Sequence, residues 1–120
     1  MRPEDIDYVS AHGTATPLND PIETKAIKAA FGDHARKLKI SSLKSMTGHC
    51  IGAAGAIESI ASILGMNEDF VHATINYDNP DPECDLDYVP NVGIHMPVRA
   101  FIKNSMGFGG QNAVVIFKKV

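Results

Sequence analysis

The chain has 120 residues, of which 44% are hydrophobic and 21% charged, a composition typical of one globular domain and unlike that of a disordered chain. Its formal net charge of −3 argues against binding to nucleic acid or to an anionic membrane, since both favour a basic protein. No stretch is apolar for long enough to span a bilayer, and the first residues lack the charged-then-apolar leader of a secreted protein.

The first two elements are predicted to be a strand and a helix. Residues 6–9 predict a short strand after a turn that contains proline. A helix start is predicted next, because Asp20 can act as the cap, Pro21 suits the first helical position and Glu23 can close a capping box. Gly32 is a typical helix stop.

A second strand and a second helix are predicted to follow. Residues 37–44 alternate in part and indicate a strand, residues 52–66 indicate a helix, and residues 71–76 indicate a third strand. The apolar positions of this helix form one wide face made of Ala53, Ala56, Ile57, Ile60, Ala61 and Leu64.

The last part of the chain begins with an irregular segment. Residues 77–97 are rich in proline and aspartate and predict a long loop, which in a compact domain is often functional or covers something. Residues 98–103 indicate a strand, residues 104–112 a glycine-rich turn, and residues 113–117 a strand buried on both faces. The order of elements predicts a layered α/β sheet that is mostly parallel and has an antiparallel end.

Three polar clusters fall at strand ends or helix starts, where α/β proteins usually place active sites. In the first cluster, His12 follows a strand, and Thr14 and Thr16 offer hydroxyls at alternate positions. The functional interpretation is a neutral imidazole that donates a hydrogen bond to a substrate oxygen, with the threonines holding a polar ligand arm. Taken alone, a structural histidine in a turn is the simpler interpretation.

The second cluster is built around Lys44 and His49. Thr47 is expected to cap the following helix, which places His49 in the first turn, where the helix dipole and the Lys44 cation both disfavour an imidazolium. A neutral histidine can donate to a developing oxyanion without first losing a proton. Glu58 is a candidate partner for Lys44. Taken alone, a surface lysine and a solvated glutamate are the simpler interpretations.

The third cluster is the glycine-rich segment 104–112, in which glycines flank Phe108. The functional interpretation is an oxyanion-hole donor combined with a gating ring. The structural alternative is a hairpin turn that needs glycines for positive φ, which is a common arrangement.

The other histidines and the two cysteines point to no further site. His34, His72 and His95 show no paired spacing, so we expect structural or surface roles, and a zinc site is disfavoured. Cys50 lies near a helix start, where a thiolate is favoured, but its position also suits apolar packing, so a nucleophilic Cys50 is the minor alternative. Cys50 and Cys84 fit a reducing compartment as free thiols, and the sequence leaves a disulfide between them open.

Taken together and in this order, the motifs resemble the β-ketoacyl-[acyl carrier protein] synthases of fatty-acid synthesis, most closely the type called synthase II. The matching stretches are DIDYV (5–9) and HGTATPLND (12–20), KSMTGH (44–49) and GAAGA (52–56), INYDNPD (75–81) and CDLDYVP (84–90), and NS (104–105) and GFGG (107–110). Four ordered motifs that cover nearly the whole chain make chance agreement implausible.

The resemblance implies a thiolase-type fold of two similar halves, each a five-stranded sheet with helices. Residues 1–120 correspond to the second half as one domain. We therefore expect the C-terminal half of a thiolase-like α/β fold, with a mixed and mostly parallel five-stranded sheet that ends in an antiparallel β-hairpin. The family's cysteine nucleophile belongs to the first half, which no segment here resembles, so this chain alone is not expected to carry out condensation.

The resemblance also implies roles for individual residues in an acyltransferase of fatty-acid elongation. His12 and His49 match the two histidines that polarise the carbonyl of the malonyl thioester. Lys44 matches the lysine that orders the second histidine, and Glu58 matches its ion-pair partner.

The remaining matched residues concern the substrate arm and the gate. Thr14 and Thr16 match the hydroxyls that hold the phosphopantetheine arm of acyl carrier protein. Phe108, with Gly109 beside it, matches the gating residue whose backbone N–H joins the oxyanion hole. No metal or cofactor is implied, because the phosphopantetheine arm is part of the substrate.

The implied partners are acyl carrier protein, the first half of the same enzyme and a second copy in a homodimer, with neither nucleic acid nor membrane. The expected compartment is the cytoplasm, or a plastid in a plant. Met106 and Gln111 depart from the family, since an aromatic residue and a threonine are usual there. The alternatives are a non-catalytic module that binds the carrier arm, a subunit completed by a separate cysteine-bearing chain, and part of a modular polyketide synthase, which the loop at 79–90 disfavours.

Overall fold

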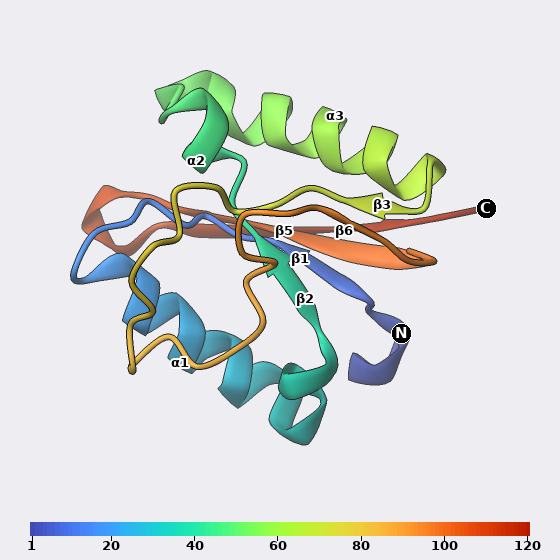
Figure 1. Cartoon of the computed structure of the whole chain (residues 1–120), viewed down its shortest axis with the longest axis horizontal. Coiled ribbons are helices and arrows are strands. Elements are labelled where there is room, and N and C mark those ends of the chain that lie inside the picture. The colour runs from blue at the N-terminus through green and yellow to red at the C-terminus, as the bar shows by residue number, and fades with distance from the viewer.

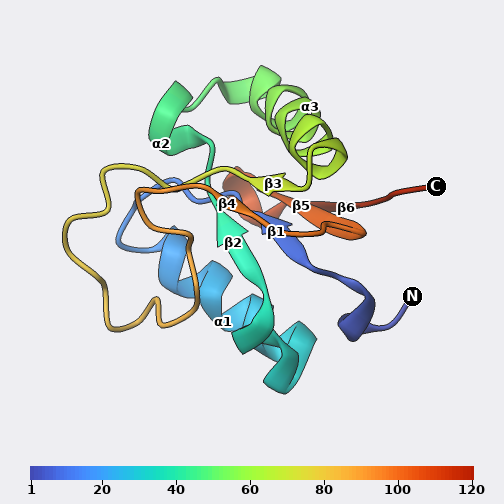
Figure 2. The ribbon, with the colours of Figure 1, turned by 45° about the vertical axis from the view of Figure 1, so that its right-hand side comes forward.

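A four-stranded sheet runs through the middle of the molecule, with helix α3 on one face and helix α1 on the other (Figures 1 and 2). The structure is a computed structural model that describes all residues from 1 to 120. The sheet has the strand order β2-β1-β5-β6, with bounds β1 Tyr8–Ser10, β2 Lys39–Ser41, β5 Ala100–Met106 and β6 Asn112–Lys118. Strand β1 is parallel to β2 and to β5, whereas β6 is antiparallel to β5.

The helices and the short elements complete the architecture. Their bounds are α1 Asn19–Phe31, α2 Lys44–Thr47, α3 Ala54–Asn67, β3 Phe70–Val71, β4 Ile94–His95, and the 3₁₀ helices Pro3–Asp5, Gly32–Lys37, Ile51–Ala53 and Phe108–Gly110. The α/β class, the mostly parallel sheet and the terminal antiparallel hairpin are confirmed. No helix has the length and apolar character needed to cross a membrane.

The number of strands in the sheet differs from the expected five. The third predicted strand, 71–76, contributes only Phe70–Val71, which pairs with β4 in a separate two-stranded sheet. Beyond Val71, the backbone bonds to the long loop instead, since Thr74 N–H donates to the Val89 carbonyl at 2.9 Å. Prolines in that loop lack the N–H that a ladder needs, which keeps the pairing local.

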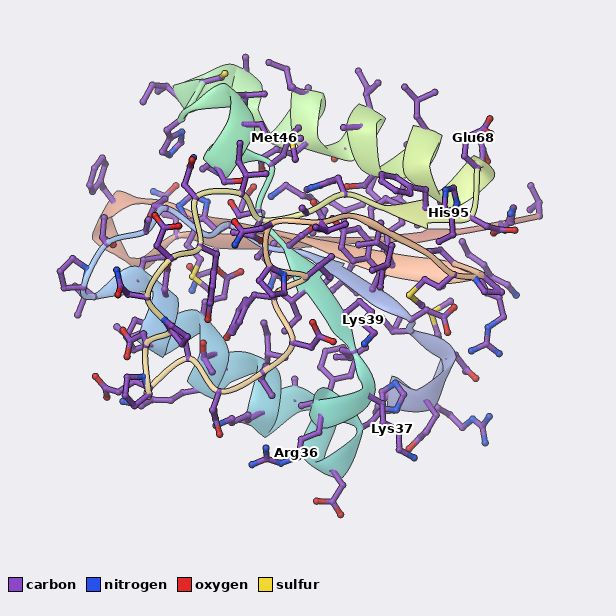
Figure 3. All side chains as sticks on the ribbon, viewed as in Figure 1. Arg36, Lys37, Lys39, Met46, Glu68 and His95 are labelled. Atoms are coloured by element: carbon purple, nitrogen blue, oxygen red, sulfur yellow. The ribbon has the colours of Figure 1, made fainter.

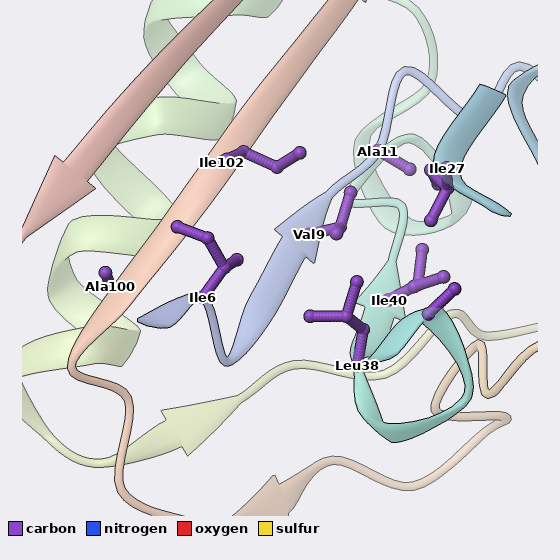
Figure 4. Close-up of a cluster of buried hydrophobic side chains, with 9 residues drawn as sticks. Ile6, Val9, Ala11, Ile27, Leu38, Ile40, Ala100 and Ile102 are labelled. Atoms are coloured by element: carbon purple, nitrogen blue, oxygen red, sulfur yellow. The ribbon is translucent and has the colours of Figure 1, made fainter. Parts of the chain in front are cut away.

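The apolar core is divided by the sheet into two clusters. Successive strand residues point to opposite faces, so Val9 faces α1 while Tyr8 faces α3. The cluster on the α1 side contains Ile6, Val9, Ala11, Ile27, Ala35, Leu38, Ile40, Ala100 and Ile102 (Figure 4). The cluster on the α3 side contains Tyr8, Met66, Val71, Val89, Val98 and Phe101. These clusters hold the ends of β1 and β2 side by side.

The predicted capping box at the start of α1 is wrong. The N-cap is Leu18, whose side chain makes no capping hydrogen bond, and the N–H of Asn19 donates instead to the Thr16 hydroxyl at 3.1 Å. The carboxylate of Asp20 turns back to the preceding loop, where it accepts from Ala15 N–H at 3.2 Å. The carboxylate of Glu23 is buried and accepts from the backbone of the loop after β1. Both carboxylates therefore organise that loop and not the first turn of the helix.

Strand β6 is not buried on both faces as predicted. Val114, Val115 and Ile116 are each more than half exposed, because β6 is the edge of the sheet and no helix covers it. Helix α3 also differs from the prediction, because its buried side carries the polar residues Glu58 and Ser62.

The wide apolar face predicted for α3 points away from the sheet, where side chains project from the outer side of the helix (Figure 3). Ile57 is 39% exposed, Ile60 59% and Leu64 60%. Contiguous apolar surface of this kind usually marks an interface.

We predict that this chain alone self-associates through the apolar face of α3. Replacing Ile60 and Leu64 together by lysine should shift the chain toward a monomer in light scattering coupled to size exclusion, because it places two charges on that face. The matched control is Ile22→Lys, since Ile22 is 48% exposed but lies on α1. A monomeric parent chain, or an equal effect of the control, would contradict the prediction.

Candidate functional site

Two histidines meet at the carboxyl ends of β1 and β2. His12 follows β1, and His49 follows the short helix α2 that begins just after β2. The centroids of the two rings are 5.5 Å apart, and the rings are nearly perpendicular at 81°. Adjacent parallel strands bring the loops at their carboxyl ends together, which is why residues 37 positions apart in sequence become neighbours.

His49 does not lie in the first turn of a helix, so the predicted cap is wrong. Thr47 is the last residue of α2, and its hydroxyl donates to the Leu43 carbonyl at 3.2 Å. His49 precedes the 3₁₀ helix Ile51–Ala53, and its Nδ1 accepts from Ile51 N–H at 3.0 Å. Because Nδ1 uses its lone pair in this bond, a neutral His49 carries its proton on Nε2 and is a donor there.

His12 is the more enclosed of the two rings, with 8% of the residue exposed. Burial lowers the pKa of His12, and the nearby Lys44 cation lowers it further. Both effects disfavour the charged form. The surroundings of His12 therefore favour the neutral imidazole that was predicted at the first cluster. The helix dipole that was predicted to act on His49 does not apply, because His49 does not lie in the first turn of a helix.

A buried carboxylate, that of Glu58, is shared by two lysines. Glu58 Oε1 accepts from Lys44 Nζ at 2.6 Å, and Glu58 Oε2 lies 2.6 Å from Lys103 Nζ without a well-directed hydrogen bond. The three side chains are between 3% and 5% exposed. The predicted pair of Lys44 and Glu58 is confirmed, and the interpretation of both as solvated surface residues is wrong.

The two lysines decide the charge state of Glu58. Burial by itself would raise the pKa of Glu58, but the close ammonium groups of Lys103 and Lys44 outweigh burial and lower it. The carboxylate therefore stays ionised. Lys103 was not predicted, although a lysine that follows the apolar run 100–102 of a predicted strand was a signal of a buried charge.

The loop that carries His12 is organised by Glu23, which sequence reasoning assigned to a helix cap. Glu23 accepts from His12 N–H at 2.8 Å, from Gly13 N–H at 2.9 Å and from Asn104 Nδ2 at 3.1 Å. Gly13 has φ +41°, and a Cβ there would lie 2.5 Å from the Cβ of Ser42. Only glycine fits this close approach, so a glycine is sterically required at position 13.

Thr14 and Thr16 line one side of a cavity of about 650 Å³ between the loop after β1, helix α1 and the long loop. Their hydroxyl oxygens are 3.2 Å apart. Tyr77, Tyr88 and Lys44 also line the cavity, whereas His12 and His49 do not. The threonines therefore face a space large enough for a small ligand, beside the histidine pair and not on it.

Phe108 and Gly109 lie in the turn between β5 and β6. Phe108 is fully exposed in the 3₁₀ helix Phe108–Gly110. Gly109 and Gly110 have φ of +78° and +80°, as a hairpin turn requires. The gating role predicted for Phe108 stays a prediction.

The remaining predicted residues have structural surroundings. His34 bonds to the Ile6 carbonyl at 2.9 Å, His95 packs on Phe70, and His72 bonds to Tyr8 and Ser41. Both cysteines are free, and no three acidic, histidine or cysteine residues are grouped closely enough to hold a metal ion.

Comparison with known proteins decides the family. The family model described as "Beta-ketoacyl synthase, C-terminal domain" matches residues 1–78. The chain belongs to the β-ketoacyl synthase family. Among relatives, it is 52% identical over 120 residues to a 3-oxoacyl-[acyl-carrier-protein] synthase 2 of Coxiella burnetii, covering all of this chain and 29% of that protein. A synthase 2 of Synechocystis is 52% identical over 119 residues, again covering 29% of its length.

Solved structures agree with the sequence relatives. A type II polyketide ketosynthase, in complex with its acyl-carrier protein and bound to a hexaketide, has a TM-score of 0.97 and 48% identity over all of this chain and 29% of its own. A β-ketoacyl synthase from Burkholderia phymatum has a TM-score of 0.88 and 34% identity, with the same coverage. The thiolase-like fold of the synthase C-terminal part is thus shown, and the chain spans under a third of its relatives.

We predict that Glu58→Gln costs about 3–5 kcal/mol of unfolding free energy at neutral pH, because it leaves two buried ammonium groups without their anion. The folded pKa of Glu58 is lowered. Its contribution is therefore complete above the pKa of an unfolded glutamate, about 4.3, and is lost as the pH falls through the lower folded pKa. Urea unfolding followed by circular dichroism at several pH values measures both effects.

The matched control for this prediction is Glu68→Gln. Glu68 lies at the end of the same helix and is exposed (Figure 3), so its loss should change stability by no more than about 0.5 kcal/mol. An equal loss of unfolding free energy in the two variants would show that the carboxylate shared by the two lysines stabilises the fold no more than an exposed one.

Proposed function

We propose that this chain supplies the histidine pair of a condensing enzyme, a 3-oxoacyl-[acyl carrier protein] synthase that elongates fatty acyl chains. The observation that carries the proposal is the His12–His49 pair above the buried Lys44–Glu58 pair, in a chain 52% identical to proteins of that name. The nucleophile is proposed to come from outside residues 1–120, either from another part of the same protein or from a second chain.

The chemistry that the two histidines support is decarboxylation of a malonyl thioester. The bond between the carboxylate and the α-carbon breaks, carbon dioxide leaves, and the electron pair moves onto the thioester carbonyl as an enolate. Two neutral imidazoles are suited to this step, because each donates a hydrogen bond to the oxygen on which charge develops. The His49 Nε2–H is such a donor, since Nδ1 is already occupied by Ile51 N–H.

The second half of the reaction forms the new carbon–carbon bond. The enolate carbon attacks the carbonyl of the acyl thioester on the nucleophile, and the sulfur of that nucleophile leaves with the electron pair as a thiolate. The proposed contribution of Lys44 and Glu58 is to hold the segment that carries His49 in place. The proposed contribution of Thr14 and Thr16 is to hold the arm of the carrier protein, which their position on the cavity supports.

The proposed partners follow from the same comparison. The ketosynthase with TM-score 0.97 is described in complex with an acyl-carrier protein, and we propose the same class of partner for this chain. The exposed apolar residues of α3 support a proposed contact with the nucleophile-bearing half of the enzyme or with a second copy.

A polyketide synthase is the second candidate, since the structure with the TM-score of 0.97 is a type II polyketide ketosynthase. The two candidates differ in the acyl chain that is extended and share the histidine chemistry. Supplying saturated acyl or β-ketoacyl carrier proteins to the complete enzyme distinguishes them by the product that accumulates.

We predict that His12→Ala and His49→Ala each lower the rate of malonyl-carrier-protein decarboxylation by about 10²–10³-fold, because each removes one donor to the enolate oxygen. The measurement is carbon dioxide release by this chain assembled with a nucleophile-bearing half. The control is His95→Ala, whose ring is exposed and packs on Phe70. Unchanged rates in both site variants, or β-ketoacyl product formed by this chain alone, would contradict the proposal.

A further inference from the structure

Lys103 is buried in β5, next to the peptide that precedes His12. Its side chain is 3% exposed, and three oxygens surround its Nζ: the Ala11 carbonyl at 3.3 Å, the Asn104 carbonyl, and Glu58 Oε2 at 2.6 Å. An ammonium has three N–H donors whereas a neutral amine has two, so this set of neighbours fits the charged form. Burial lowers the pKa of Lys103, and the close carboxylate of Glu58 opposes that effect.

The same lysine acts on one end of a single peptide group. The Ala11 carbonyl and the His12 N–H belong to one peptide bond, whose oxygen faces the Lys103 ammonium and whose N–H donates to the Glu23 carboxylate at 2.8 Å. A cation at the oxygen end and an anion at the N–H end both match the dipole of the peptide. Asn104 joins the two sides, since its carbonyl accepts from Lys103 and its Nδ2 donates to Glu23.

We infer that Lys103 is a positioning residue, which together with Glu23 clamps the Ala11–His12 peptide and whose charge adds to that of Lys44 in favouring the neutral form of the His12 imidazole. The inference rests on the proposed function only for what a neutral His12 then does to a substrate.

The groups that set the charge of His12 come from every element around it. Glu23 of α1, Lys44 of α2, His49 of the loop after α2 and Lys103 of β5 act on it directly, and Glu58 of α3 is the ion-pair partner of both lysines. Burial lowers the pKa of His12 most, Lys44 and Lys103 lower it further, and Glu23 raises it. The two members of the clamp therefore shift the pKa of His12 in opposite directions, since Lys103 lowers it and Glu23 raises it.

Because the two residues shift the pKa of His12 in opposite directions, substituting each of them distinguishes a charge effect from a loss of structure. Lys103→Met removes a cation and should move the titration of His12 to higher pH. Glu23→Gln removes an anion and should move it to lower pH. A variant that merely loosened the clamp would admit water to His12, relieve the cost of burying its charge, and raise the midpoint in both cases.

The readout is the exchange of the imidazole Cε1 proton in deuterium oxide, followed across pH by mass spectrometry for each histidine. This measurement resolves single sites in the full chain and needs no catalysis, so it can fail while the condensing function holds, and the reverse is also true. Lys103→Gln is the second variant, because its amide keeps a donor for the Ala11 carbonyl while it removes the charge. It keeps the test decisive if Lys103→Met does not fold.

The expected result is an upward shift of the His12 midpoint in the Lys103 variants, a downward shift in Glu23→Gln, and no shift in the control Lys37→Met, whose side chain is exposed after α1 (Figure 3). Faster amide exchange at His12 in both clamp variants is expected as well, since the clamped peptide contains that N–H. An unmoved or lowered midpoint in the Lys103 variants, or a rise in both classes of variant, overturns the inference.

Discussion

The arrangement of the site depends on one buried carboxylate that is shared by two ammonium groups. Glu58 lies on α3, Lys44 on α2 and Lys103 on β5, so a single set of charges ties together both helices and the central sheet. Breaking such a group leaves uncompensated charge in the interior, which is costly. The cluster therefore restricts how α2 and α3 can sit on the sheet, and with them the loop that carries His49.

This constraint also explains why α3 is oriented with its polar side inward. Glu58 has to reach both lysines, so the helix turns Ala54, Glu58, Ser62 and Met66 toward the sheet and leaves its wide apolar face outside. An amphipathic helix in an independent domain normally does the opposite. The outward apolar face agrees with the contact proposed for α3, in a chain that spans 29% of the length of its relatives.

The first histidine depends on a second group of charges that meets the first. Glu23 and Lys103 hold the two ends of the peptide before His12, and Asn104 links them. Two cations, Lys44 and Lys103, and two anions, Glu23 and Glu58, are therefore buried in this part of the molecule. A buried polar network of this kind favours one arrangement of the core when every member is paired, and it destabilises the fold when one member is missing.

Much of the fold and part of the site could be predicted from sequence. Strand and helix periodicity predict the α/β class, and the resemblance of ordered motifs predicts the pairing of Lys44 with Glu58. The errors arose where long-range contacts override local patterns. Glu23 fits a capping box locally, yet its carboxylate accepts from the loop after β1. Thr47 fits a cap, yet α2 ends there.

Other features had no local signal strong enough to reveal them. The apolar run of β6 indicated a buried strand, but burial depends on what lies beside the sheet edge, which the run itself does not encode. The predicted strand 71–76 does not join the main sheet, because the backbone of Thr74 hydrogen-bonds to residues of the long loop. Lys103 could have been suspected from its place after an apolar run, but its partners come from segments 45 and 92 residues away.

Neutron crystallography of the deuterium-exchanged chain near neutral pH tests most directly whether the histidines are neutral and the neighbouring charge cluster is fully ionised. We expect one deuteron on each of the His12 and His49 rings, placed on Nε2 of His49, together with three deuterons on Lys44 and on Lys103 and none on Glu58. A doubly deuterated His12, or an uncharged lysine beside a deuterated Glu58, would contradict the account.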